Sequence, residues 1–228
     1  MTTLPSGSAA DLTLAFLGGT GDQGRGLARR FAMAGNAVII GSRQADRAEQ
    51  AAAELAATVP DPSLVTGTDN AAAAAAADVI VIAVPWEGHE TLVTALAPAL
   101  AAKIVIDCVN PMGFDKQGAF ALRVPEGSAA QQAARLLPDS TVVAAFHHVS
   151  AVLLLDPEVE QVETDVLVLG EDREATDLVQ ALIDRIAGMR GIYGGRLRNA
   201  GQVEALTCNL GSINRRYKAH AGLRVTDV

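Results

Sequence analysis

A glycine-rich segment near the N-terminus has the spacing G-x-G-x-x-G. Its residues are Gly19, Thr20, Gly21, Asp22, Gln23 and Gly24. After a strand and before a helix, this spacing is typical of a turn that binds the pyrophosphate of a dinucleotide, because the glycines allow a tight turn, close approach of phosphate and helix packing. The helix N-terminus adds unpaired N–H groups and a partial positive charge. A glycine-rich turn with a structural role only is the alternative, and the context favours the dinucleotide site.

The residues about 20 positions further on indicate which dinucleotide binds, because NAD sites usually have Asp or Glu there. This chain has Ser42 and Arg43, with Arg47 one helical turn later. An acidic side chain would repel a 2′-phosphate, whereas guanidinium and hydroxyl groups bind it through charge-assisted hydrogen bonds. We therefore predict NADP(H). The alternative is that both arginines only solvate a helix end.

Other candidate residues follow later predicted strands. His147 and His148 come after one strand and Trp86 after another. His147 is the one candidate for a catalytic role, and a loop histidine that satisfies backbone groups is the alternative. Trp86 is either a wall of the cofactor cleft or a core residue, and Cys108 is interpreted as structural.

The side chains that most enzyme classes require do not form a recognisable pattern. The sequence has no Ser-His-Asp arrangement, no His/Cys cluster at metal-ligand spacing and no lysine placed as in hydroxyacid dehydrogenases. We therefore expect no metal and no obligatory catalytic acid or base.

Apolar runs that alternate with helical segments must position these residues. The pattern predicts an α/β fold of the Rossmann type, with a doubly wound parallel sheet covered on both faces. The expected strands are residues 12–17, 37–40, 64–66, 78–84, 103–107 and 141–146. Helices are expected between them, including a short alanine-rich helix at residues 71–77.

The alternation changes after His147, which suggests a division of the chain. We expect a flexible N-terminal tail at residues 1–10, an NADP-binding Rossmann domain at residues 11–150 and a small C-terminal α/β subdomain at residues 151–228. In the last part we predict a strand at residues 162–169, a helix at 173–187, an extended piece at 190–193 and a helix at 199–219. This subdomain is expected to pack on the sheet.

The composition argues against several kinds of partner. Half of the 228 residues are hydrophobic and the net charge is −8, which disfavours nucleic acid and anionic membrane surfaces. The two cysteines are too few and too far apart for a disulfide scaffold or a metal motif, and no signal peptide or membrane span is evident. We expect a cytoplasmic protein that acts on small-molecule cofactors.

The C-terminal segment from Arg190 onward is basic. It holds seven of the 18 basic residues of the chain against two acidic ones. The basic residues are Arg190, Arg196, Arg198, Arg215, Arg216, Lys218 and Arg224. Such an excess suggests either an anion site, which would suit a phosphate-bearing cofactor, or a solvated helix face.

With these residues in view, the chain resembles the F420-dependent NADP oxidoreductase family. The resemblance rests on six segments: LGGTGDQG at residues 17–24, GSR at 41–43, VPWE at 84–87, DCVNP at 107–111, FHHVSA at 146–151 and EALT at 204–207.

The resemblance implies reversible hydride transfer between NADP(H) and the deazaflavin coenzyme F420, in a cleft between the two domains of a homodimeric enzyme. It places the deazaflavin near His147 and Val149. It places NADP against Gly19, Thr20, Gly21, Asp22, Gln23, Gly24, Ser42, Arg43, Arg47, Trp86 and Ala151. The alternatives are a reductase of the same fold that acts on a flavin, a ferric chelate or a small imine, and a non-catalytic NADP sensor.

Overall fold

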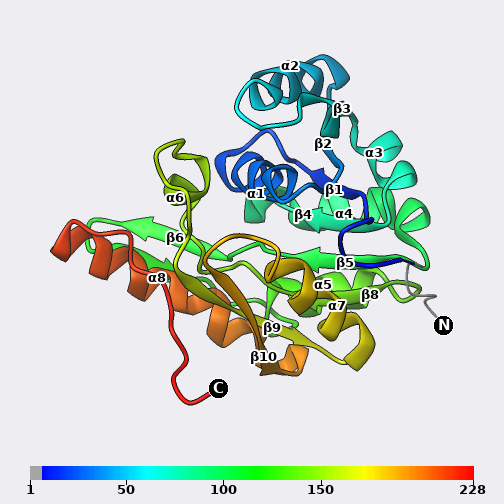
Figure 1. Ribbon diagram of the computed structural model, residues 1–228. Helices are drawn as coiled ribbons and strands as arrows, with labels where there is room; N and C mark the ends of the chain where they lie inside the picture. The colour runs from blue at the N-terminus through cyan, green and yellow to red at the C-terminus, as the bar shows by residue number, and fades with distance from the viewer. Residues whose placement is uncertain (1–6) are drawn as a thin grey trace.

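The computed structural model describes residues 7–228, and a single eight-stranded sheet forms its centre (Figure 1). The strand order across the sheet is β10-β9-β8-β5-β4-β1-β2-β3. The strands are β1 (Leu14–Leu17), β2 (Val38–Ser42), β3 (Val65–Asp69), β4 (Val79–Ile82), β5 (Ile104–Asp107), β8 (Thr141–Ala144), β9 (Thr164–Gly170) and β10 (Met189–Gly195). From β3 to β8 all pairs are parallel, which confirms the predicted Rossmann-type sheet.

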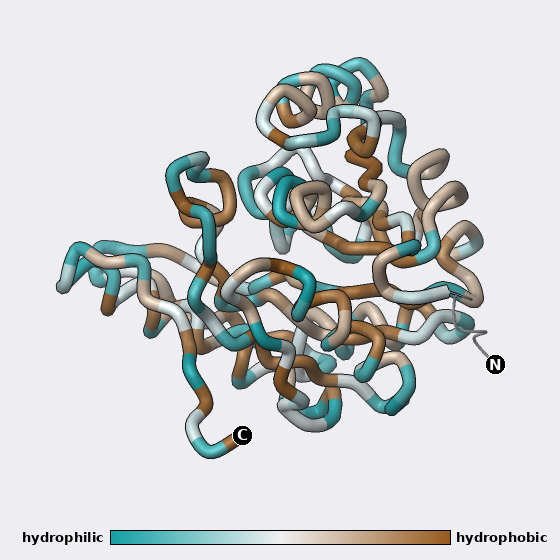
Figure 2. The backbone as a smooth tube through the Cα atoms, in the orientation of Figure 1, coloured by the Kyte–Doolittle hydropathy of each residue, from teal (hydrophilic) through white to brown (hydrophobic). Residues whose placement is uncertain are grey.

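Helices cover both faces of the sheet. They are α1 (Asp22–Met33), α2 (Ala45–Ala56), α3 (Asn70–Ala76), α4 (Trp86–Leu100), α5 (Ala129–Leu136), α6 (Ala151–Leu155), α7 (Arg173–Ile183) and α8 (Ala200–Tyr217), with short 3-10 turns at Pro62–Leu64 and Leu197–Asn199. One core joins the sheet to α1, α2, α6 and α7, and the other joins it to α3, α4, α5 and α8. Strands β1, β4 and β5 are buried throughout because they face both cores, so hydrophobic residues concentrate along the centre of the molecule (Figure 2).

The C-terminal part has α/β content as predicted, but its arrangement differs from the expected one. Strands β9 and β10 join the edge of the central sheet beside β8 instead of packing on its face. The chain reverses between β8 and β9, so these two strands pair antiparallel, and β10 pairs parallel with β9. The apolar pattern indicated the strands but held no information on this direction.

A hairpin of two strands and one short helix were not predicted. Strands β6 (Met112–Asp115) and β7 (Gly118–Ala121) form an antiparallel hairpin that lies along α8 (Figure 1). The Asp115 carboxylate accepts hydrogen bonds from the backbone N–H groups of Gln117 and Gly118, and Gly118 has a φ of 127° that favours glycine. The other unpredicted element is the short helix α6.

Residues 1–6 of the expected N-terminal tail lie outside the described residues. Further along the same segment, the Asn36 side-chain amide donates a hydrogen bond to the carbonyl oxygen of Ala9 at 2.8 Å. Within residues 7–228, none of the helices combines the length and apolar character that a membrane span requires.

Candidate functional site

The candidate residues gather at the carboxyl edge of the parallel strands. Strands β2, β1, β4, β5 and β8 are successive neighbours, so the segments that follow them lie side by side. Neighbouring strands are about 4.8 Å apart, and four steps from β2 to β8 give an edge roughly 19 Å long. This edge is where open α/β sheets bind ligands.

Three glycines shape the turn between β1 and α1. A Cβ atom on Gly19 would lie 2.5 Å from the Phe16 carbonyl oxygen, and one on Gly24 would lie 2.6 Å from the Gly19 Cα. A Cβ on Gly21 would meet no atom within 4 Å. Gly19 and Gly24 are therefore required by close packing, whereas Gly21 leaves an open approach to the N-terminus of α1, which no side chain caps.

The other residues of this turn have different environments. Thr20 is half-buried and Asp22 is exposed, where its carboxylate pairs with Arg25 at 3.1 Å. The Gln23 side-chain amide donates to the Phe146 carbonyl oxygen at 3.3 Å, which links the start of α1 to the segment after β8. The turn is also held by Asn70, because its Oδ1 accepts the N–H of Gly18 at 3.2 Å. Asn70 was not predicted as a site residue.

Two arginines stand at the tip of β2. Arg43 and Arg47 are exposed, and neither has an ion pair or a side-chain hydrogen bond among the described residues. Ser42 is buried, and its hydroxyl accepts the N–H of Gln44 at 3.3 Å. The β2 tip therefore presents two free guanidinium groups next to the glycine turn, an arrangement that suits a phosphate group.

Trp86 begins α4 directly after β4. Its ring is half-buried and stacks on His89, with ring centroids 5.5 Å apart and planes inclined by 27°. The orientation of Trp86 at the sheet edge therefore depends on a histidine that was not predicted to matter.

His89 belongs to a buried ionic network. Its Nε2 lies 2.7 Å from Asp107 Oδ2 and its Nδ1 lies 2.9 Å from Gln132 Oε1, and neither His89 nor Asp107 is exposed. Burial alone would lower the pKa of His89, but the Asp107 carboxylate and the two hydrogen bonds outweigh it and raise the pKa. The raised pKa favours the imidazolium form of His89, in which both ring nitrogens donate.

Glu204 of α8 completes this network. Its carboxylate accepts the N–H groups of Ala129 and Ala130, at 3.0 and 3.2 Å, at the N-terminus of α5. Burial raises the pKa of Glu204 to about 7, and repulsion from Asp107 adds to the effect of burial. The network therefore connects α4, β5, α5 and α8 beneath the sheet edge.

His147 lies at a junction of three segments. Its Nδ1 donates to Asn110 Oδ1 at 3.2 Å, while its carbonyl oxygen accepts from Asn110 Nδ2 and from the Thr207 hydroxyl, both at 2.7 Å. Burial lowers the pKa of His147 to about 4, so the ring is neutral near pH 7. Its Nε2 is buried and has no hydrogen-bond partner among the described residues, which leaves one acceptor available to a donor group.

The neighbours of His147 are also enclosed. His148 Nε2 accepts the N–H of Leu167 on β9 at 3.3 Å, so this histidine satisfies a backbone group. Val149 is buried, and Ala151 begins α6, which packs against α1. Cys108 is buried, its thiol donates to the Ile82 carbonyl oxygen at 3.0 Å, and burial raises its pKa. These contacts agree with a structural role for Cys108.

The burial of His148 predicts a specific dependence of stability on pH. Burial lowers the pKa of His148 from 6.5 to about 4. The unfolded chain therefore binds a proton that the folded protein does not bind in this range, so stability falls as the pH decreases from 6.5 to 4. Because one pKa unit corresponds to about 1.4 kcal/mol, His148 removes about 3 kcal/mol from the free energy of unfolding across this window.

The variant His148→Gln keeps an acceptor for the Leu167 N–H and does not titrate. Between pH 7 and pH 4, we expect the free energy of unfolding of the wild type to fall by about that amount relative to the free energy of unfolding of this variant. Urea unfolding at several pH values gives the free energy of unfolding of both proteins. The contributions of other titrating groups cancel when one value is subtracted from the other. Parallel stability curves would show that His148 is not held neutral.

The structure thus brings most candidate residues to one edge, in the order Arg43 and Ser42, the glycine turn, Trp86, and then His147 with Val149. Residues of the glycine turn, the junction and the network were missed, namely Asn70, His89, Asn110, Gln132, Glu204 and Thr207. The resemblance drew on the segments that contain Asn110, Glu204 and Thr207 without assigning them a role. A carboxylate at the end of an apolar strand, as at Asp107, is the signal that could have indicated a buried partner.

Comparison with known proteins gives consistent matches. Residues 13–111 match a family described as NADP oxidoreductase coenzyme F420-dependent. An F420-dependent NADP reductase of Methanothermobacter thermautotrophicus is 39% identical over 223 residues, which are 95% of this chain and 96% of the relative. A protein of the same description from Methanocaldococcus jannaschii is 36% identical over 224 residues, 95% of this chain and 99% of the relative.

A solved structure also covers nearly the whole chain. It comes from Arthrobacter sp. FB24, is assigned as an F420-dependent NADP reductase, and superimposes with a TM-score of 0.79 at 27% identity. The alignment covers 94% of this chain and 99% of that protein.

Proposed function

Because the chain belongs to the family of F420-dependent NADP reductases, we propose that it transfers a hydride reversibly between NADP(H) and coenzyme F420. The observation that carries this proposal is the sheet edge itself. A glycine turn open at Gly21 lies between two unpaired arginines on one side and the buried His147 junction on the other.

The residues at this edge fit NADP(H). We assign Arg43, Arg47 and Ser42 to the 2′-phosphate and the segment from Gly19 to Gly24 to the pyrophosphate. Trp86 and Ala151 would border the rest of the dinucleotide. The fit rests on the open space at Gly21, the uncapped N-terminus of α1 and the lack of an acidic residue at the β2 tip.

The opposite end of the edge is assigned to the deazaflavin, with His147 and Val149 beside its ring. The support is chemical, because His147 is neutral near pH 7 and has a buried nitrogen without a donor. In this proposal residues 11–150 form the NADP-binding domain, and residues 151–228 complete the cleft. Thr207 contributes to this closure through its hydrogen bond to the His147 carbonyl oxygen.

When both cofactors are bound, NADPH would supply a hydride, and the deazaflavin would offer as acceptor the ring carbon that replaces N5 of a flavin. The chain itself provides positioning and exclusion of water. His89 fixes the orientation of Trp86, Asn110 fixes the tautomer of His147, and the buried surroundings of His147 keep water away. The hydride transfer itself needs no acidic or basic residue, and the one proton that completes the reduction of the deazaflavin at a ring nitrogen would come from solvent.

The proposal is tested by following absorbance under anaerobic conditions with NADPH and a panel of acceptors. The panel contains F420, flavin mononucleotide, a ferric chelate and a cyclic imine. We expect turnover with F420 well above that with each other acceptor. Reduction of another acceptor without F420 would identify a different reductase, and tight NADPH binding without any turnover would identify a sensor.

A cytoplasmic location remains a prediction. We also propose that the protein is a homodimer. Ile213 and Tyr217 of α8 are 40% and 70% exposed, and their spacing of four residues places them on one face of the helix. An apolar face of this kind suits a contact between two copies.

Light scattering during size-exclusion chromatography should therefore give the mass of a dimer. The double variant Ile213→Asp/Tyr217→Asp should give that of a monomer, because charges on this face would remain unpaired in the interface. A monomeric wild type would refute the dimer, and a dimeric variant would place the contact elsewhere.

A further inference from the structure

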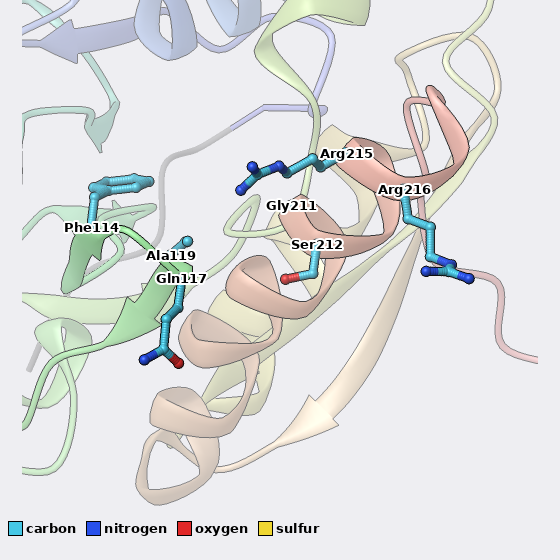
Figure 3. A pocket seen from close by; sticks show the side chains of 8 residues that line it. Phe114, Gln117, Ala119, Gly211, Ser212, Arg215 and Arg216 are labelled. Carbon is cyan, nitrogen blue, oxygen red and sulfur yellow. The ribbon is translucent and has the colours of Figure 1, made fainter.

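A cavity of about 670 Å³ lies between the β6–β7 hairpin and α8, outside the edge assigned to the dinucleotide. Its walls are formed by Phe114, Gln117 and Ala119 of the hairpin and by Ser212, Arg215 and Arg216 of the helix (Figure 3). We call this space the hairpin cavity. The hairpin wall presents the ring of Phe114, which is 75% exposed, together with the polar Gln117, and the helix wall carries the positive charge of the arginines.

The hairpin cavity is connected to the His147 junction by both of its walls. The hairpin begins at Met112, two residues after Asn110, and α8 passes the same junction at Thr207. The Asn110 side-chain amide donates to the Thr207 hydroxyl at 3.2 Å. This hydrogen bond joins the segment that precedes the hairpin to α8, so both walls of the cavity lead away from the His147 junction. They then run outward side by side (Figure 1).

The helical period places Arg215 in line with this junction. Thr207, Gly211 and Arg215 are four residues apart and lie on one face of α8. A rise of 1.5 Å per residue puts Arg215 about 12 Å beyond Thr207 along the helix axis. Ile213 and Tyr217 point to the opposite side, so a dimer contact there leaves the cavity face free.

The charge of the cavity is uncompensated. Arg215 and Arg216 have no ion pair and no side-chain hydrogen bond among the described residues, although the chain has a net charge of −8. Figure 3 shows Arg215 extending from α8 toward the hairpin and Arg216 extending to the other side of the helix. Arg215 is therefore the guanidinium placed to meet an anionic group in the cavity.

We propose that the hairpin cavity binds the anionic tail of the deazaflavin, with Arg215 contacting its phosphate or glutamate carboxylates. This inference rests on the proposed function, because it takes the deazaflavin ring to lie at the His147 junction. A ligand held there by its ring and carrying a flexible, phosphate-bearing chain would reach the hairpin cavity by extending along α8. Phe114 and Gln117 would border the chain, and Arg215 would pair with its charge.

The test compares F420 with the same deazaflavin lacking the phosphate and glutamates. Isothermal titration without NADPH gives the Kd of each ligand for the wild type, Arg215→Ala, Arg215→Lys and the control Arg173→Gln. Arg173 lies at the start of α7, and its side chain is 92% exposed, so its loss changes the net charge without touching the cavity.

We expect Arg215→Ala to raise the Kd of F420 about tenfold and to leave that of the tail-less ligand unchanged. Arg215→Lys should recover most of the loss, and Arg173→Gln should behave as the wild type. An unchanged F420 affinity in Arg215→Ala, or equal losses for both ligands, would overturn the inference while the proposed function stands. If the wild type binds neither deazaflavin, the proposed function itself is wrong, and the inference with it.

Discussion

Replacement of both arginines at the β2 tip, in Arg43→Ala/Arg47→Ala, is expected to raise the Kd of NADPH about 100-fold. Arg43→Ala alone should raise it about tenfold, because each free guanidinium offers a charge-assisted hydrogen bond to the 2′-phosphate. NADH lacks this phosphate, so its Kd should change less than about twofold. Fluorescence titration of both nucleotides measures the two effects.

Arg173→Gln serves as the control for the loss of positive charge and should bind NADPH as the wild type does. Equal weakening of NADPH and NADH in the double variant would contradict the assignment. It would mean that the arginines stabilise the fold or contact the adenosine, which both nucleotides share. The preference for NADP would then come from other residues.

The second large effect concerns stability. Asp107→Ala is expected to lower the free energy of unfolding by about 3–5 kcal/mol, because it leaves the fully buried His89, whose pKa this carboxylate raises, without its ionic partner. Asp107→Asn should cost less, because the amide oxygen still accepts a hydrogen bond. Urea unfolding near pH 7 measures the free energy of unfolding of both variants.

A double-mutant cycle with His89→Ala separates the pair from its surroundings. The double variant Asp107→Ala/His89→Ala should be clearly less destabilised than the sum of the single variants, since no unpaired charge remains. Additive losses would show that the two side chains contribute independently. Loss of His89 should also weaken NADPH binding, because Trp86 stacks on that ring.

The central fold could be predicted from the sequence because its strands are buried on both faces. Strands such as β4 are apolar at every position, and this pattern is visible without any partner. The direction of β9 could not be predicted, because it depends on how the chain turns after Ala151. The β6–β7 hairpin was missed because its half-exposed strands show no clear alternation of apolar and polar residues.

The parts of the candidate site that could be predicted are those whose role depends on a short, continuous stretch of the sequence. Gly19, Gly21 and Gly24 act through the backbone of one turn, and Arg43 follows a strand end, so spacing alone identifies them. The network of His89, Asp107 and Glu204 depends on contacts between distant segments. Neither its burial nor the raised pKa of His89 can be inferred from residue types, because both result from packing among α4, β5, α5 and α8.

The most direct test of the account uses NADPH with deuterium at both C4 positions of the nicotinamide. The protein is incubated anaerobically with this NADPH and oxidised F420 in ordinary water, and the reduced deazaflavin is analysed by mass spectrometry. We predict that each product molecule carries one deuterium, because the hydride passes directly between the two bound rings. Reduced F420 without deuterium, or no reduced F420 at all, would contradict the account.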